Sequence, residues 1–304
     1  MRDLVVNLLL LALLPPLLPG VINRVKARFA GRQGPPLLQP YFDIVKLMQK
    51  GLVLSTTTSW VFVAAPVVSL ATALLAGLLV PLGSFDAPIA FSGDLILFVY
   101  LFALGRFFTT AAALDTGSPF EGMGAAREVT FACLSEAAVF CALLVLARLA
   151  ATPNFSLTVL LHSPLHAAFT QSVAPLVLVA IGMFIVLLAE NSRMPVDDPN
   201  THLELTMIHE VMVLDHGGPL LGLIEYGAAM KLFVLSALFL HVVVPFQSGQ
   251  PALDWLLFVA EMIALAAAIA VVESVMARLR MRHVPYLLVA AILFCGFGFV
   301  LLVR

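Results

Sequence analysis

The apolar run "SVAPLVLVAIGMFIVLLA" spans Ser172–Ala189, and the polar stretch "ENSRMPVDDPNTHLELTMIHE" follows it directly, from Glu190 to Glu210. A helix needs about 20 apolar residues to cross the hydrocarbon core of a bilayer. Because backbone polar groups must be satisfied inside lipid, the run predicts a membrane-spanning α-helix. The acids, histidines and prolines that crowd its end predict a loop with a function of its own.

The composition of the whole chain is that of a membrane protein. Of its 304 residues, 62% are hydrophobic and 11% are charged, whereas a soluble domain has roughly 25% charged residues. The net charge of −2 and the lack of a basic tail make nucleic acid an unexpected partner. The three cysteines lie in apolar stretches without paired spacing. The cysteines therefore predict neither a disulfide framework nor an iron–sulfur cluster, and we expect no cofactor in this chain.

Eight apolar stretches predict an all-α integral membrane protein that forms a single polytopic domain over residues 1–304. The first stretch lacks the multibasic start and the cleavage site of a signal peptide, so we expect a retained helix. The predicted spans are Leu4–Ile22, Val61–Leu82, Leu95–Leu114, Val129–Ala150, Ser172–Ala189, Leu220–Val244, Leu253–Val275 and Tyr286–Val303.

The loops between these spans alternate in charge. The second, fourth and sixth loops, at residues 83–94, 151–171 and 245–252, contain no lysine or arginine, whereas every odd loop contains at least one. By the positive-inside rule the odd loops face the cytoplasm, and both termini face the other side.

Two of the odd loops contain patterns typical of short surface helices. In the first loop, "QPYFDIVKLMQKG" (residues 39–51) mixes apolar side chains with Asp43, Lys46 and Lys50, which predicts an amphipathic helix at the membrane interface. In the fifth loop, "THLELTMIHEVMVL" (residues 201–214) repeats apolar residues at i, i+4 and i+8, which predicts a second surface helix. These helices either form a docking platform for a soluble partner or simply order the loops.

Ionisable residues also occur within the predicted spans. A charge at bilayer depth costs about 2.5–3.5 kcal/mol on insertion scales, so such residues are functional candidates. Near the end of a span, snorkelling to the surface is the alternative, and it applies to Arg148 and Glu190. Glu136, Lys231 and Glu273 lie within apolar runs, where a function is favoured. The full set is Arg106, Glu136, Arg148, Glu190, Glu225, Lys231, Glu261 and Glu273.

Most acids of the chain fall in or near the predicted cytoplasmic half, where a helix bundle would gather them around one cavity. A buried carboxylate is driven towards its neutral form, and a nearby arginine or lysine restores its charge. A file of such groups can pass protons. No zinc-protease, nucleotide-binding or acyl-transfer motif is present, so catalysis by this chain alone is not expected. His202 and His209 share a helix face with acids nearby, but no metal-ligand set is fixed, and we predict no metal.

Several stretches, in order, carry a resemblance to a known family. They include the basic first loop, "DTGSPFEGMGAARE" (residues 115–128) followed by Glu136, "AENSRMPVDDP" (residues 189–199) and "VVESVMARLRMR" (residues 271–282). The third stretch is similar to the AExxRxPFD signature of subunit 1 of respiratory complex I. The chain resembles that superfamily over nearly its whole length. Its motifs are closer to the hydrogenase-4 component C and formate hydrogenlyase subunit 4 branch, of group 4 membrane-bound nickel–iron hydrogenases.

The resemblance implies a non-catalytic subunit in the cytoplasmic membrane of a bacterium or archaeon. Such a subunit docks the peripheral redox arm and links it to subunits that translocate ions. The implied partners are a nickel–iron large subunit, an iron–sulfur small subunit, further iron–sulfur proteins and antiporter-like membrane subunits. The nickel–iron centre and the iron–sulfur clusters would then belong to those partners.

The resemblance also implies roles for individual residues. The residues of a proton path or coupling route would be Glu136, Glu190, Glu204, Glu273, Asp197, Glu128 and Lys231. The residues that hold loops or dock the arm would be Arg127, Arg193, Asp43, Lys46, Asp115, Arg278 and Arg280. His202 and His209 are added as groups that titrate near pH ~6.5 when unperturbed.

The fifth loop departs from the complex I pattern, which leaves the function open between two forms of the family. Val196 replaces a phenylalanine, Asn200 and His202 stand where glutamates are expected, and "DHGG" at residues 215–218 replaces "EYSG". These changes weaken the alternative of a quinone-chamber subunit in a complex I-like NADH or ferredoxin:quinone oxidoreductase. A stand-alone carrier is disfavoured, because neither an inverted repeat nor paired broken helices are evident.

Overall fold

The computed structural model describes residues 2–83, 85–150, 155–162, 173–197, 207–244 and 250–303. All regular structure in these ranges is helical, which confirms the predicted all-α class. The α-helices are α1 Arg2–Leu13, α2 Leu17–Phe29, α3 Gln39–Met48, α4 Trp60–Leu79, α5 Asp94–Asp115, α6 Pro119–Ala150, α7 Leu157–His162, α9 Val173–Glu190, α10 Gly218–Val243, α11 Pro251–Val275 and α12 Val284–Val303. Two 3-10 turns, η1 Glu210–Val213 and η2 Met281–His283, complete the described set.

The predicted number of membrane helices is confirmed. In the described ranges, seven helices are long and apolar enough to cross a bilayer, and α1 with α2 makes an eighth span if the bent pair is counted as one. The long α6 begins at Pro119, whereas the span was predicted from Val129. The added turns contain charged residues, which hydropathy assigns to a loop.

The first span is broken, whereas a continuous helix was predicted there. The axes of α1 and α2 differ by 45°. Pro16 has no N–H, so it cannot bond the carbonyl of Ala12 as a continuous helix requires. Instead the Tyr226 hydroxyl donates to Ala12 O at 2.7 Å, and the Tyr41 hydroxyl donates to Leu13 O. Two tyrosines therefore satisfy carbonyls that lipid would leave unpaired.

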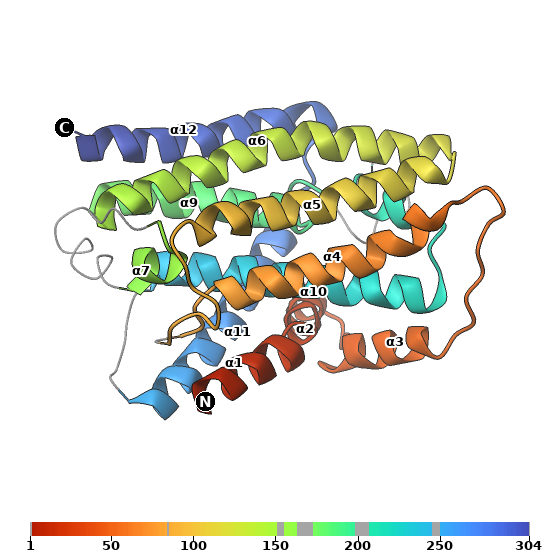
Figure 1. Cartoon of the computed structure of the whole chain (residues 1–304), viewed down its shortest axis with the longest axis horizontal. Coiled ribbons are helices and arrows are strands. Elements are labelled where there is room, and N and C mark those ends of the chain that lie inside the picture. Colours follow the sequence, from red (N-terminus) through yellow and green to blue (C-terminus); the bar gives the residue numbers. More distant parts are fainter. Residues whose placement is uncertain are drawn as a thin grey trace.

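Most of the spanning helices pack into one bundle around α10. Helices α4, α5, α6, α9, α10 and α12 lie side by side, and α2 packs against α11 (Figure 1). Helix α10 is the most enclosed of the seven candidate spans, because 78% of its most apolar 18-residue segment is buried. Small residues allow the closest approach: a Cβ added to Gly182 of α9 would lie 2.5 Å from Cys295 Sγ of α12.

The surface helix predicted in the first loop is confirmed as α3. It lies beside α10 and α2, at the edge of the bundle (Figure 1). None of its residues is buried, and its exposed apolar side chains are Phe42, Val45 and Met48. Met48 also approaches Gly222 of α10, so α3 is held against the bundle while Phe42 and Val45 stay exposed; exposed apolar side chains of this kind suit a helix at the membrane interface.

The fifth loop, between α9 and α10, differs from its prediction. Residues 198–206, which include His202 and Glu204, lie outside the described residues. The described remainder of the predicted helix forms only the short η1 turn. The carboxylate of Asp197 accepts the backbone N–H groups of Ile208 and His209, at 3.1 and 3.3 Å. These donors would serve carbonyls one turn earlier in an α-helix, so their capture by Asp197 explains the difference.

Candidate functional site

A single arginine joins the acids of two helices at the centre of the bundle. Arg106 lies on α5, and its side chain is only 10% exposed. Its Nε donates to Glu128 Oε1 of α6 at 3.1 Å, its Nη1 donates to Glu136 of the same helix, and its Nη2 donates to Glu190 of α9 at 2.7 Å. Glu128 and Glu136 are two turns apart and face the same way. One guanidinium is therefore shared by three carboxylates.

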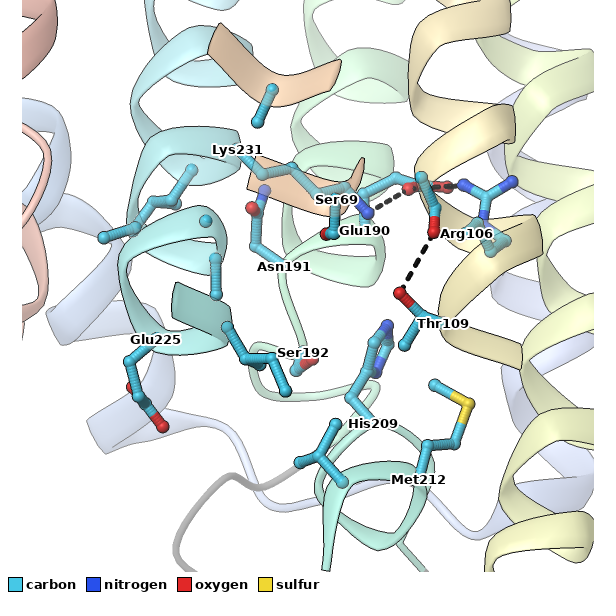
Figure 2. Close-up of a pocket in the computed structure, with 18 of the residues that line it drawn as sticks. Ser69, Arg106, Thr109, Glu190, Asn191, Ser192, His209, Met212, Glu225 and Lys231 are labelled. Carbon is cyan, nitrogen blue, oxygen red and sulfur yellow. Dashed lines mark hydrogen bonds and ion pairs between the residues drawn. The ribbon is translucent and has the colours of Figure 1, made fainter. Parts of the chain in front are cut away.

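Glu190 receives a second cation from the opposite direction. Lys231 of α10 places its Nζ 2.6 Å from Glu190 Oε2, and the Ser135 hydroxyl donates to Glu190 Oε1. Lys231 and Arg106 approach Glu190 from opposite sides (Figure 2). We call Arg106, Glu128, Glu136, Glu190 and Lys231 the Arg106 cluster. The cluster holds three carboxylates and two cations.

The contacts of the Arg106 cluster show which of the two span-end residues, Glu190 and Arg148, can be explained by snorkelling. Snorkelling does not describe Glu190, because its side chain is 9% exposed and bonded to two cations. Arg148, by contrast, is exposed at the end of α6, as a snorkelling residue would be. Desolvating charges is costly, and a pair withstands it only when good contacts compensate. The density of contacts around Arg106 meets that condition.

His209 connects the Arg106 cluster to the fifth loop. Its Nε2 lies 3.0 Å from Glu128 Oε2, and its Nδ1 lies 3.7 Å from Asp197 Oδ2. Burial alone would lower the pKa of His209, but the two carboxylates outweigh it and raise that pKa to about 9. Asp197 is 1% exposed and also binds Arg278 Nη2 at 2.8 Å. Burial would raise the pKa of Asp197, but His209 and Arg278 hold it below its usual range.

Glu273 lies in a separate ion group. Its carboxylate, on α11, is fully buried and contacts Lys26 Nζ of α2 at 2.8 Å and Arg193 Nη1 of the fifth loop at 3.5 Å. This group ties the fifth loop to the second half of the broken span. The family resemblance implied one route for Glu273, Glu136 and Glu190, whereas the described contacts give Glu273 different partners.

A cavity of about 370 Å³ lies between α4, α5, α10 and the fifth loop (Figure 2). The Arg106 cluster forms part of its wall, through Arg106, Glu128, Glu190 and Lys231. Two further acids, Glu210 and Glu225, line it as well. Burial and the neighbouring Glu225 raise the pKa of Glu210 to about 7. Glu210 is thus a group on the cavity wall that can exchange protons near neutral pH.

The remaining predicted residues lie outside the Arg106 cluster. Arg127 donates to Met207 O at 2.8 Å and so holds the second described part of the fifth loop, which begins at Met207. Asp115 accepts the Ser59 N–H at 2.6 Å, which joins the end of α5 to the start of α4. Asp43 and Lys46 are exposed on α3, and Arg280 is exposed before η2.

Sequence reasoning named Arg106 as a membrane charge but gave it no role. The available signal was a lone cation within its span, at a depth similar to that of acids in neighbouring spans. Ser135 and Glu225 were likewise left without a role, because a hydroxyl or an acid shows its partners only in three dimensions. Glu210 was counted among the acids expected around one cavity, but no partner was assigned to it. In the described ranges, no group of three or more His, Cys, Asp or Glu side chains could hold a metal ion.

Comparison with known proteins agrees with the resemblance drawn from the motifs. A family model described as NADH dehydrogenase matches residues 3–304. The chain is 32% identical to formate hydrogenlyase subunit 4 of Escherichia coli (strain K12), over 98% of this chain and 95% of that protein. It is 33% identical to hydrogenase-4 component C of the same organism, over 79% of this chain and 74% of that protein.

A solved structure supports the fold. A chain of the membrane-bound sulfane sulfur reductase, an archaeal respiratory membrane complex, superposes with a TM-score of 0.79 at 21% identity, covering 99% of this chain and 100% of that one. The NADH-ubiquinone oxidoreductase chain 1 of Mycosarcoma maydis is 28% identical, over 78% of this chain and 75% of that protein. The chain therefore belongs to the NADH dehydrogenase subunit 1 family and is a multi-pass membrane subunit of a complex I-like assembly.

Proposed function

We propose that this chain is the coupling subunit of an energy-converting nickel–iron hydrogenase or formate hydrogenlyase. It docks the peripheral redox arm on its odd-numbered loops, which face the cytoplasm, and it carries protons towards ion-translocating membrane subunits. One observation carries the proposal: the Arg106 cluster, in which Arg106, Glu128 and Glu190 are almost fully buried, forms part of the wall of a cavity that reaches the fifth loop. The two Escherichia coli relatives are named formate hydrogenlyase subunit 4 and hydrogenase-4 component C, and these names support the proposal.

The charges of the Arg106 cluster suit proton transfer. Three carboxylates face two cations, so one negative charge in the cluster is in excess. A single added proton would balance the cluster without moving a helix. Carboxylates this close titrate as a group, so the proton can belong to any of them. Such a cluster can receive a proton at Glu128 and release it at Glu136 or Glu190.

The partners follow from the hydrogenase form of the proposal. The chain would bind a nickel–iron large subunit and an iron–sulfur small subunit through the first, third and fifth loops. Further iron–sulfur proteins would bring electrons, and antiporter-like subunits would receive the coupling signal. The redox centres would all lie in these partners, while this chain supplies the anchor and the titrating groups.

The cavity favours a second candidate function. Its volume of about 370 Å³ lies within the range of roughly 300–1,000 Å³ typical of small-molecule pockets. Part of its wall is apolar, formed by residues such as Phe102, Met212 and Leu232. A quinone-chamber subunit of a complex I-like oxidoreductase would use such a space. Because the fifth loop departs from the complex I pattern, we rank this candidate below the hydrogenase form.

The test uses the intact complex, isolated through an affinity tag on this chain and reconstituted into liposomes. Hydrogen evolution from reduced methyl viologen and proton movement, followed by a pH-sensitive dye, are measured together. We expect Glu190→Gln to assemble and to evolve hydrogen but to lose proton movement. Glu261→Gln, at membrane depth on α11 outside the Arg106 cluster, is the matched control and should behave as the wild type.

Two outcomes would contradict the proposal. Normal proton movement in Glu190→Gln would remove the role of the Arg106 cluster. Quinone reduction blocked by a quinone analogue, in a complex that evolves no hydrogen, would instead establish the second candidate.

A further inference from the structure

His209 occupies the one position from which a single side chain contacts both the Arg106 cluster and the loop acid Asp197, within the described residues. Its ring nitrogens face Glu128 on one side and Asp197 on the other. The charge of Asp197 is already balanced by Arg278. A protonated His209 therefore adds its charge to the Arg106 cluster, which lacks one positive charge.

We propose that His209 is the proton donor and acceptor at the entrance to the Arg106 cluster. Its Nε2 passes a proton to Glu128 Oε2, 3.0 Å away. The N–H bond breaks and an O–H bond forms, so the imidazolium becomes neutral, Glu128 becomes a carboxylic acid, and the total charge is unchanged. The inference deepens the proposed function and depends on it.

The surroundings of His209 favour its charged form before transfer. The acids that face it are Glu128 from α6 and Asp197 from the fifth loop, with Glu210 next to it in the chain. Lys231 from α10 opposes its charge, and Arg106 from α5 lies behind Glu128. The acids prevail, as the raised pKa of His209 also indicates.

The geometry also provides for the step after transfer. Neither ring nitrogen makes an aligned hydrogen bond, so a rotation of the ring, rather than a shift of a helix, brings the proton into line. A second cavity, of about 10 Å³, is lined by Glu128, Ser135, Glu190 and His209. That volume is on the order of one water molecule. One water molecule in this cavity would border both Glu128 and Glu190.

After transfer the loop stays in place while the ring is released. Asp197 keeps Arg278 and two backbone N–H donors, so it remains fixed when the attraction of the imidazolium disappears. His209, with a side chain 22% exposed, borders the larger cavity and has space to turn. It can then take up the next proton from that cavity.

The first test compares two substitutions in the reconstituted complex. Glutamine cannot titrate, and arginine keeps a fixed positive charge because it is not deprotonated in proteins. We expect both His209→Gln and His209→Arg to lower proton movement per hydrogen formed by ~100-fold, the low end of what a positioned acid–base group contributes. If His209 were only an ionic bridge, arginine would restore proton movement, and that result would overturn the proposal.

The second test is the pH profile of proton movement. The wild type should lose activity as pH rises through about 9, where His209 loses its proton. Asp197→Asn removes one of the acids that raise this pKa, so the loss of proton movement at alkaline pH should occur at a lower pH than in the wild type. A loss that stays at the wild-type pH in Asp197→Asn would also overturn the proposal.

His216 provides the matched histidine control. It stacks on Phe62 with ring centroids 3.8 Å apart, and burial lowers its pKa. His216→Gln should leave the pH profile of proton movement unchanged. A changed profile would overturn the assignment of the activity loss at alkaline pH to His209.

If Glu190→Gln moves protons normally, the proposed function itself fails. If Glu190→Gln is inactive while His209→Arg is active, only the role of His209 fails.

Discussion

Removal of Arg106 should destabilise the chain more than any other single loss of a surface or membrane charge. Arg106→Ala would leave Glu128, Glu136 and Glu190 facing one another without their shared cation. Truncating one partner of a buried ion pair costs about 3–5 kcal/mol, because the remaining charge stays desolvated. Lys231 still contacts Glu190, so we expect the low end of this range, a loss of about 3 kcal/mol in the free energy of unfolding.

The geometry of Arg106 makes lysine a poor replacement. The three guanidinium nitrogens point to three different carboxylates, whereas an ammonium is a compact charge without a planar fork. Each charged hydrogen bond contributes roughly 1.5–3 kcal/mol. We therefore expect Arg106→Lys to lose at least about 1.5 kcal/mol, less than the alanine variant.

The assay is unfolding of the full-length chain in mixed detergent micelles, followed by the fluorescence of Trp60 and Trp255. Arg148→Ala is the matched control, because Arg148 is an exposed arginine at the end of α6. Such an exposed substitution should stay within about 0.5 kcal/mol of the wild type. In Arg106→Ala/Glu190→Gln, one of the unpaired acids is also removed. The double variant should thus be more stable than the sum of the two single losses predicts, by about 0.5–3 kcal/mol.

Two results would refute this reasoning. Arg106→Ala with the stability of Arg148→Ala would mean that the carboxylates are not ionised around Arg106. Strict additivity in the double variant would mean that Arg106 and Glu190 do not interact.

Two further predictions concern the cavity wall and the helix packing. The pKa of Glu210 is raised from 4.5 to about 7, so the folded state holds an extra proton between these values and loses stability as pH rises through them. Glu210→Gln should lack that slope and melt at a higher temperature than the wild type at pH ~8; equal pH slopes would contradict this. Gly182→Ala places a Cβ 2.5 Å from Cys295 Sγ and 3.0 Å from the Ala291 carbonyl oxygen, which should cost about 1–3 kcal/mol in unfolding free energy. Gly296→Ala, with nothing within 4 Å of its added Cβ, is the control, and equal stabilities of the two variants would show that α9 and α12 are less tightly packed.

The spans could be predicted from the sequence because lipid imposes a simple rule on backbone polar groups. The bend in the first span could not, although Pro15 and Pro16 were visible. A bend of this kind needs hydroxyl groups to satisfy the freed carbonyls, and these come from Tyr41 and Tyr226, far along the chain. The surface helix α3 was predictable for the opposite reason, since its periodicity is entirely local.

The candidate site was predictable in its membership but not in its pairing. Depth in a span identified Glu136 and Lys231, and the family motif identified Glu190, yet the partner of each depends on how the helices rotate and pack. The same limit applies to Glu273, whose partner Lys26 lies on the second half of the broken span. In the fifth loop, a helical pattern at residues 201–214 competed with Asp197, and in the described part the carboxylate took the backbone donors.

The tyrosines at the break in the first span have a consequence for biosynthesis. Tyr226 and Ala12 are 214 residues apart in the chain. When α1 leaves the ribosome, the residue that will bond the Ala12 carbonyl has not been translated. The bond between Tyr226 and Ala12 can therefore form only after α10 has been made. The span that is made first thus depends on a later helix for its mature shape.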